Sequence, residues 1–191
     1  MIKKFLKIKF IAPFVPSIIA IISVIFLVLL VAHTSSMSNE MVEDGLFYVP
    51  FNDNINYYIS SEFGYRNDPV NIGSSNYHTG MDFVAPEGTD ILSSCSGEVI
   101  RVGHNEGSLG NFVILKHNID GKIIYTAYGH MFNDSIIVEV GQHVDAKQKI
   151  GVIGSTGKST GTHLHFTVMT PNPRFTKDNL VNPREVLTDL K

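Results

Sequence analysis

Hydrophobic residues follow two different patterns along this chain of 191 residues. From about Asn56 onward, short runs rich in valine, isoleucine, phenylalanine and tyrosine are separated by glycine and polar residues, a pattern typical of β-strands joined by turns. Asp120-Gly121 predicts a type I′ hairpin turn, because this dipeptide accepts positive φ angles. No long amphipathic helical pattern occurs in this part, so we expect a mostly antiparallel β domain. The runs predict strands at residues 97–102, 111–116, 122–128, 135–140, 150–153 and 162–169.

One helix is predicted at the end of the chain. Asn182 can cap it, Pro183 occupies the first helical position, and Glu185 completes a capping box. We therefore expect the domain to close with a helix that begins at Pro183.

The N-terminal pattern is a continuous apolar run. Residues 11–32 carry no charged side chain and are long enough to cross the hydrocarbon core of a membrane. Four lysines precede this run and the first charges after it are acidic, so the positive-inside bias leaves the N-terminus in the cytoplasm. A cleaved signal peptide is the alternative, but the run exceeds the usual length of about 7 to 15 residues and residues 31–34 make a poor cleavage site.

These patterns divide the chain into four parts. We expect a short basic cytoplasmic tail at residues 1–10, a single transmembrane anchor at 11–32, a linker at 33–54 and a folded domain at 55–191. The linker contains an apolar patch at residues 46–51 that can dock on the domain. The prediction is a single-pass protein of the cell membrane whose domain is extracytoplasmic.

Charge and cysteine content exclude some functions. Without the four N-terminal lysines the chain has 15 − 4 = 11 basic residues against 18 acidic ones, a formal charge of 11 − 18 = −7 with histidine neutral. An acidic exterior without basic clusters argues against nucleic acid as a partner. Cys95 is the single cysteine, which excludes an intramolecular disulfide. We interpret it as a small, half-buried residue before a turn rather than as a nucleophile.

The candidate chemistry centres on two histidines near the C-terminus. His163 and His165 are two residues apart in a predicted strand, so their rings share one face at a spacing of roughly 7 Å. Leu164, Phe166 and Val168 then face the opposite way, into a core. A strand with an apolar face toward the core and imidazoles on its other face is suited to a metal site.

Matching partners lie upstream at His78, Asp82 and His130. Nitrogen and carboxylate ligands together favour zinc, and three protein ligands with an open fourth position are typical of a catalytic zinc site. On a straight strand His78 and Asp82 would be about 13 Å apart, so the backbone must bend between them. The sequence therefore predicts zinc-dependent hydrolysis.

The glycine-rich stretch at residues 151–160 is not a phosphate-binding loop. The motif requires a glycine five residues before Gly157, but Val152 stands there, and a strand rather than a helix follows. We interpret the stretch as a turn that places Ser159 and Thr160 near the rim of the histidine face.

The chain resembles the lysostaphin-type (LytM-domain) zinc endopeptidases of bacterial cell walls. Their signature pairs His-x-x-x-Asp with a later His-x-His, and the resemblance covers about residues 56–187. It is carried by the blocks Ser61-Glu62-Phe63-Gly64-Tyr65-Arg66, His78-Thr79-Gly80-Met81-Asp82-Phe83, Gly110-Asn111-Phe112-Val113-Ile114-Leu115-Lys116-His117, Tyr128-Gly129-His130-Met131, Gly154-Ser155-Thr156-Gly157 and Ser159-Thr160-Gly161-Thr162-His163-Leu164-His165-Phe166.

This resemblance implies a fold and a set of roles. The fold would be an all-β, small antiparallel barrel-sandwich of the duplicated hybrid motif type. One Zn²⁺ would be held by His78, Asp82 and His165, and the two catalytic histidines that do not bind metal would be His130 and His163.

The implied function is a zinc metalloendopeptidase that hydrolyses peptide cross-links of peptidoglycan through a metal-activated water. Members of the family divide between glycine-rich bridges and links that involve D-alanine or meso-diaminopimelate, and we expect the groove loops at residues 67–77 and 103–110 to set this choice. Thr167 departs from the pattern, because many relatives have an acidic residue there. The remaining histidines are interpreted as surface groups or as supports for the ligands, namely His33, His104, His117 and His143.

Two other functions remain open. The domain can serve as a non-catalytic extracytoplasmic scaffold or activator of another cell-wall hydrolase, although no ligand position is lost here. A lipoyl-like carrier or a sugar-transport phosphocarrier shares the barrel-sandwich pattern, but both belong in the cytoplasm and the predicted anchor argues against them. The sequence identifies no protein regulator.

Overall fold

The computed structural model describes residues 47–67 and 75–190. The predicted cytoplasmic tail, the transmembrane anchor and residues 33–46 of the linker lie outside the described residues. Within the described ranges, no helix has the length and apolar character needed to cross a membrane.

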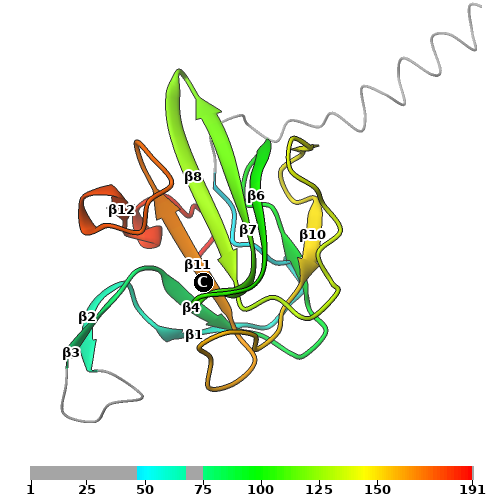
Figure 1. Cartoon of the computed structure of the whole chain (residues 1–191), viewed down its shortest axis with the longest axis vertical. Coiled ribbons are helices and arrows are strands. Elements are labelled where there is room, and N and C mark those ends of the chain that lie inside the picture. The colour runs from blue at the N-terminus through cyan, green and yellow to red at the C-terminus, as the bar shows by residue number, and fades with distance from the viewer. Residues whose placement is uncertain (1–46, 68–74, 191) are drawn as a thin grey trace, which may run out of the picture. The chain divides into compact units, whose positions relative to one another are not determined.

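Among the described residues, eight strands form the main sheet (Figure 1). Their order is β1 (Tyr58–Ser61), β4 (Met81–Val84), β11 (Leu164–Met169), β8 (Lys122–Gly129), β7 (Gly110–Ile119), β6 (Gly97–Glu106) and β9 (His143–Val144), with β12 (Leu180–Val181) paired to β11. Two smaller sheets pair β5 (Asp90–Leu92) with β10 (Lys149–Val152), and β2 (Gly64–Asn67) with β3 (Ser75–His78). All these pairings are antiparallel, so the predicted all-β, antiparallel class is confirmed.

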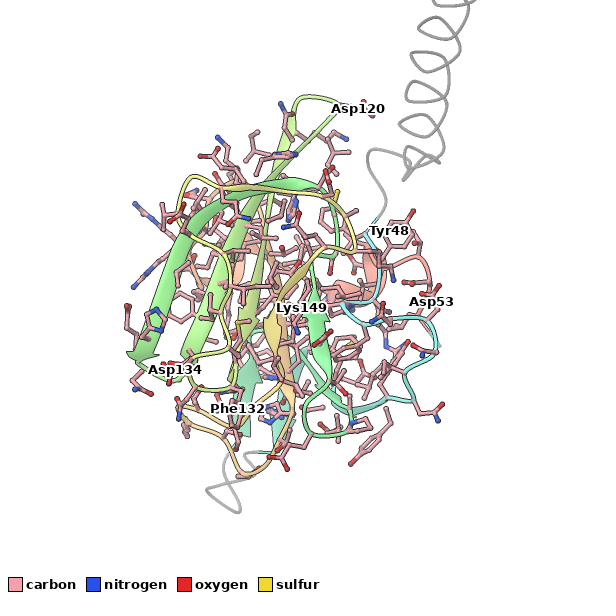
Figure 2. The ribbon with its side chains drawn as sticks, turned by 90° about the vertical axis from the view of Figure 1, so that its right-hand side faces the viewer. Tyr48, Asp53, Asp120, Phe132, Asp134 and Lys149 are labelled. Atoms are coloured by element: carbon pink, nitrogen blue, oxygen red, sulfur yellow. The ribbon has the colours of Figure 1, made fainter. Side chains whose placement is uncertain are left out.

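The predicted hairpin turn is confirmed. Asp120 and Gly121 have φ angles of 50° and 81°, as a type I′ turn requires, and Ile119 pairs with Lys122 across it. Asp120 lies at the tip of the β7–β8 hairpin (Figure 2).

Five of the six predicted strands are present, but the strand predicted at residues 135–140 is wrong. This segment makes one ladder-like bond, from the Ile137 N–H to the Ile150 carbonyl at 3.2 Å. The Ser135 hydroxyl accepts the N–H of Val152, so this N–H cannot form a second backbone hydrogen bond between the two segments. Positive φ angles at Asp134 and Gly141 bound the segment with turns.

The predicted closing helix is a single 3₁₀ turn, η2 (Pro183–Glu185). The Asn182 side chain does cap it by accepting the N–H of Arg184 at 3.1 Å. The turn stops because the next residues are held by another part of the chain: Leu187 forms a parallel bridge with Phe47, and the Thr188 N–H donates to the Phe47 carbonyl. Long-range pairing therefore ends the helix. A second 3₁₀ turn, η1 (Lys177–Asn179), precedes β12.

The apolar patch of the predicted linker belongs to the hydrophobic core. Phe47, Val49 and Phe51 are at most 3% exposed and cluster with the core residues of the sheet. The Val49 N–H also donates to the Asp189 carboxylate at 2.6 Å. The folded domain therefore includes residues that precede position 55.

Two residues, His117 and Cys95, are more deeply buried than expected. His117 is fully buried, which corrects its interpretation as a surface or ligand-supporting group. One ring nitrogen contacts the Ser96 carbonyl and the other the Thr126 hydroxyl, each at 2.8 Å, so the ring is satisfied inside the core. Cys95 is buried rather than half-buried. His104 and His143 are exposed as expected, and His33 lies outside the described residues.

The alternation predicted for the last strand is confirmed. Leu164, Phe166 and Val168 are fully buried in the main core. His163 and His165 leave the strand on the other side, where the candidate site lies.

Candidate active site

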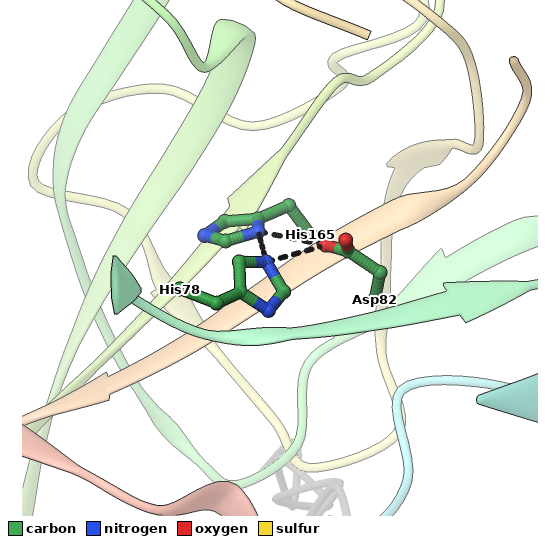
Figure 3. Close-up of side chains that lie close together, drawn as sticks. All are labelled: His78, Asp82 and His165. Carbon is green, nitrogen blue, oxygen red and sulfur yellow. Dashed lines mark hydrogen bonds and ion pairs between the residues drawn. The ribbon is translucent and has the colours of Figure 1, made fainter. Parts of the chain in front are cut away.

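Three neighbouring segments bring His78, Asp82 and His165 together (Figure 3). His78 ends β3, Asp82 lies in β4, and Asp82 is the direct register partner of His165 in β11. The predicted bend between His78 and Asp82 is present at residues 79–80. Gly80 is required there, because a Cβ atom at this position would lie 2.3 Å from the Phe166 carbonyl oxygen.

The three side chains converge on one carboxylate oxygen. Asp82 Oδ1 lies 3.0 Å from His78 Nε2 and 2.8 Å from His165 Nδ1, and the two ring nitrogens are 3.0 Å apart. All three residues are buried. Burial acts to raise the pKa of Asp82. When the facing nitrogens of His165 and His78 carry protons, their hydrogen bonds and charges outweigh burial and hold the pKa of Asp82 well below its usual range.

The far sides of both rings are anchored. His78 Nδ1 lies 2.8 Å from the Glu62 carbonyl, which can only accept, so His78 donates there and keeps its lone pair on Nε2. His165 Nε2 lies 3.2 Å from the Thr79 hydroxyl and 3.1 Å from the Thr167 hydroxyl. With the proton on Nε2, the lone pair of His165 is also directed at the carboxylate.

This donor set fits a metal cation. Two imidazole lone pairs and a carboxylate oxygen, all within 4.8 Å of one another, converge on one buried position. Anchoring of the distal ring nitrogen by a carbonyl or hydroxyl is typical of histidines that bind metal. Without a cation, three such acceptors would face one another unfavourably.

A second histidine pair lies beside the first group. The rings of His130 and His163 are 4.5 Å apart between centroids, and His130 lies 5.8 Å from the His165 ring. His163 Nε2 is 3.7 Å from Asp82 Oδ1. Both rings are held through Nδ1: His130 donates to the Thr156 carbonyl at 2.7 Å, and His163 to the Gly161 carbonyl at 2.8 Å.

His130 has an unusual backbone conformation and a lowered pKa. Its φ angle of 60° is unusual for a residue with a side chain and is often found at functional sites. Burial, with the nearby charges of His163 and His165, lowers the pKa of His130 to about 4. The Thr156 hydroxyl donates to the Met131 carbonyl and accepts the Asn111 N–H, which fixes the carbonyl that holds His130.

An open groove of about 770 Å³ contains all five candidate residues. Asn76 and Tyr77 line it from the first predicted groove loop, and residues 68–74 of that loop lie outside the described residues. Ser108 and Leu109 line it from the second loop. Ser159 and Thr160 also line the groove, in agreement with the prediction for the glycine-rich turn.

Sequence reasoning missed the groups that hold the rings. The carbonyls of Glu62 and Thr156 carry no side-chain signal, so no residue pattern identifies them. Thr167 was detectable, because it lies two residues after His165 and so shares its face of the strand. Arg66 was also missed; its guanidinium contacts the Ser61 hydroxyl and lies 3.5 Å from Asp82 Oδ2.

Comparison with known families matches residues 76–183 to peptidase family M23. The chain belongs to this family. The matched segment covers more than half of the chain and includes all five candidate site residues. The chain is therefore a member of a zinc metallopeptidase family, and a metal cofactor agrees with the His-Asp-His group described above.

Individual relatives agree with this assignment. The peptidoglycan DD-endopeptidase ShyB of Vibrio cholerae is 40% identical over 95 residues, which are 50% of this chain and 21% of ShyB. The chain spans about a fifth to a third of the length of the curated relatives it matches.

Solved structures show the same fold. The catalytic domain of lysostaphin from Staphylococcus simulans is 34% identical with a TM-score of 0.58, over 68% of this chain and 91% of that domain. A zinc-containing peptidase from Vibrio cholerae is 33% identical with a TM-score of 0.59, over 76% of this chain and 41% of its own.

Proposed function

We propose that this chain is a membrane-anchored zinc metalloendopeptidase that hydrolyses peptide cross-links of peptidoglycan. The observation that carries the proposal is the convergence of His78, Asp82 and His165 on one buried position, inside a groove that also holds His130 and His163. The M23 assignment and the similarity to the peptidoglycan DD-endopeptidase ShyB support the reaction and the substrate. We also assign the domain to the barrel-sandwich fold of the duplicated hybrid motif type.

Zinc is the proposed metal because two imidazoles and one carboxylate make a typical catalytic zinc set. Bound there, it supplies Lewis acidity and lowers the pKa of a coordinated water toward about 7. His78 and His165 would hold it as neutral rings through the nitrogens that face Asp82, together with the Asp82 carboxylate. The Glu62 carbonyl keeps His78 in the required tautomer, and the two threonine hydroxyls can accept the Nε2 hydrogen of His165 in its required tautomer.

His130 and His163 are proposed to move protons. Each donates its Nδ1 hydrogen to a backbone carbonyl, so in the neutral ring the lone pair is on Nε2. Such a ring can take a proton from the attacking water and later return it to the leaving amine. The protonated form can stabilise the negative charge that develops on the substrate carbonyl oxygen. The two ring centroids are 4.5 Å apart and the rings are tilted by 54°, so one groove position can reach both of them.

The location follows from the proposed substrate and the N-terminal sequence. Residues 11–32 are proposed to anchor the chain with its N-terminus in the cytoplasm, and residues 33–46 to lead to the domain outside the membrane. Peptidoglycan is then accessible to the groove.

The test is digestion of purified peptidoglycan by the zinc-loaded full-length chain, with mass spectrometry of the released peptides. Cross-link cleavage products are expected with the wild type, and neither His165→Ala nor chelator-treated protein should release them. If the folded, zinc-loaded protein releases no product, the endopeptidase proposal fails and a scaffold or activator of another wall hydrolase becomes the better explanation.

A further inference from the structure

The groove carries two positive charges that the proposed reaction does not use. Arg66 on β2 and Lys158 in the turn before β11 both line it. Among the described lining residues, Asp82 is the one carboxylate, and it already faces the two imidazoles. By contrast, the chain after its four N-terminal lysines is acidic, with 15 − 4 = 11 basic and 18 acidic residues. Local positive charge in an acidic protein favours a ligand with negative charge.

The backbone of Lys158 is held in place by a hydrogen bond and by close packing. Its N–H donates to the Ser108 carbonyl at 2.9 Å. The preceding Gly157 has a φ angle of 71°, and a Cβ atom there would lie 2.4 Å from the backbone nitrogen of Gly110. The turn is therefore packed tightly against the loop that precedes β7, although the Lys158 side chain itself is exposed.

The ammonium group of Lys158 is available to a ligand. Within the described part of the chain, no carboxylate forms an ion pair with it. The next residue, Ser159, has its hydroxyl 3.3 Å from His163 Nδ1, and Lys158 lines the same groove as this proposed catalytic ring. A substrate group held by Lys158 would therefore lie in the groove that contains the candidate active site.

Arg66 supplies a second, partly compensated charge. Its Nη1 contacts the Ser61 hydroxyl and lies 3.5 Å from Asp82 Oδ2, while its buried Nε–H has no acceptor among the described residues. The guanidinium is thus held close to the candidate metal-binding carboxylate, while the Arg66 side chain is 28% exposed and lines the groove. It adds to the positive potential of the groove.

We propose that Lys158, assisted by Arg66, binds a free carboxylate of the peptide substrate next to the scissile bond. The enzyme would then prefer cross-links that carry such a carboxylate over uncharged bridges such as glycine chains. This inference rests on the proposed function, and it makes Lys158 a residue that determines specificity. An ion pair in the open groove would orient the peptide and favour substrates of matching charge.

The test uses two synthetic cross-linked peptides that differ in one group. One carries a free carboxylate on the residue next to the scissile bond, and the other carries a carboxamide there. The zinc-loaded full-length wild type is expected to cut the carboxylate peptide with a kcat/KM about tenfold higher. Lys158→Gln should raise KM for that peptide about tenfold and largely remove the preference, whereas Lys158→Arg should retain it because the charge is kept.

Lys122→Gln is the matched control. Lys122 is an exposed lysine of β8 that does not line the groove, so this variant should keep the wild-type preference. The inference is overturned if the wild type cuts both peptides equally or favours the carboxamide, or if Lys158→Gln lowers cleavage of both to the same degree.

A failure of the proposed function can be distinguished from a failure of the Lys158 proposal. If the wild type cuts neither peptide and also leaves purified peptidoglycan intact, the endopeptidase proposal fails. If the wild type cuts peptidoglycan but neither synthetic peptide, its cleavage rates on untreated peptidoglycan and on peptidoglycan with amidated peptide carboxylates are compared. Equal rates on amidated and untreated material then contradict the role of Lys158, and slower cleavage of the amidated material supports it.

Discussion

Asp82 and His165 are direct partners across the β4–β11 pair, and Asp82 Oδ1 lies 2.8 Å from His165 Nδ1. This pairing makes the sheet itself part of the candidate metal centre. Because strand register fixes both Cα positions, the spacing of these two donors depends on backbone hydrogen bonds rather than on a flexible loop. His78 is then added by the turn at Gly80.

Removing the charge of Asp82 should greatly weaken metal binding. We expect Asp82→Asn to weaken zinc affinity by more than about 100-fold. The carboxylate is a proposed ligand, and losing a ligand should cost more affinity than losing a group that only supports one. Competition with a chromophoric chelator measures this change. Asp90→Asn is the control, because Asp90 pairs with Lys149 away from the groove. Similar affinities in the two variants would exclude Asp82 as a ligand.

Thr167 should tune the affinity of the site without destroying it. We expect Thr167→Val, which keeps the shape of the side chain, to weaken zinc binding about tenfold because it removes a hydroxyl from His165 Nε2. The Thr79 hydroxyl remains as a second partner. Thr188→Val removes a hydroxyl that donates to the Phe47 carbonyl and should leave zinc affinity unchanged. Equal zinc affinity in both variants would show that Thr167 only packs.

The folded domain should require residues before position 55. A chain that begins at residue 55 lacks Phe47, Val49 and Phe51, and it is expected to unfold at a much lower urea concentration than one that begins at residue 42. Phe51→Ala alone should lower the free energy of unfolding by about 3 to 5 kcal/mol, because its ring is 1% exposed. If the shorter chain is equally stable, the docking of this segment contributes nothing to stability.

Acid should destabilise the domain partly through His117. Burial lowers the pKa of this ring in the folded state to about 4 from its ordinary value of 6.5. The unfolded chain therefore binds the proton first as the pH falls, so the contribution of His117 to stability is complete above pH 6.5 and is lost between about pH 6.5 and 4. The shift corresponds to about 3 kcal/mol.

Urea unfolding at several pH values measures this effect. His117→Gln cannot titrate, so its free energy of unfolding should fall less steeply over that pH range than that of the wild type. His104→Gln, at an exposed position, should keep the wild-type slope. Parallel curves for the wild type and His117→Gln would mean that other groups control acid sensitivity.

Local patterns in the sequence predicted a large part of the fold. The alternation around His163 and His165 indicated which side chains enter the core, and Asp120-Gly121 indicated the hairpin, because strand periodicity and turn preference depend on neighbouring residues. Local preference failed at residues 135–140 and after Pro183. In the first case the Ser135 hydroxyl accepts the Val152 N–H, which is then lost to strand pairing. In the second, the Thr188 N–H donates to the Phe47 carbonyl and the helix ends.

The sequence by itself determined the residue types of the candidate site and the face that His163 and His165 share. Only the tertiary structure decided that His78 reaches Asp82, that the Glu62 and Thr156 carbonyls orient two of the rings, and that Lys158 faces the groove. The physical reason is that side-chain periodicity is a local property of the backbone, whereas hydrogen bonds to carbonyls and contacts across the sheet depend on which distant segments pair.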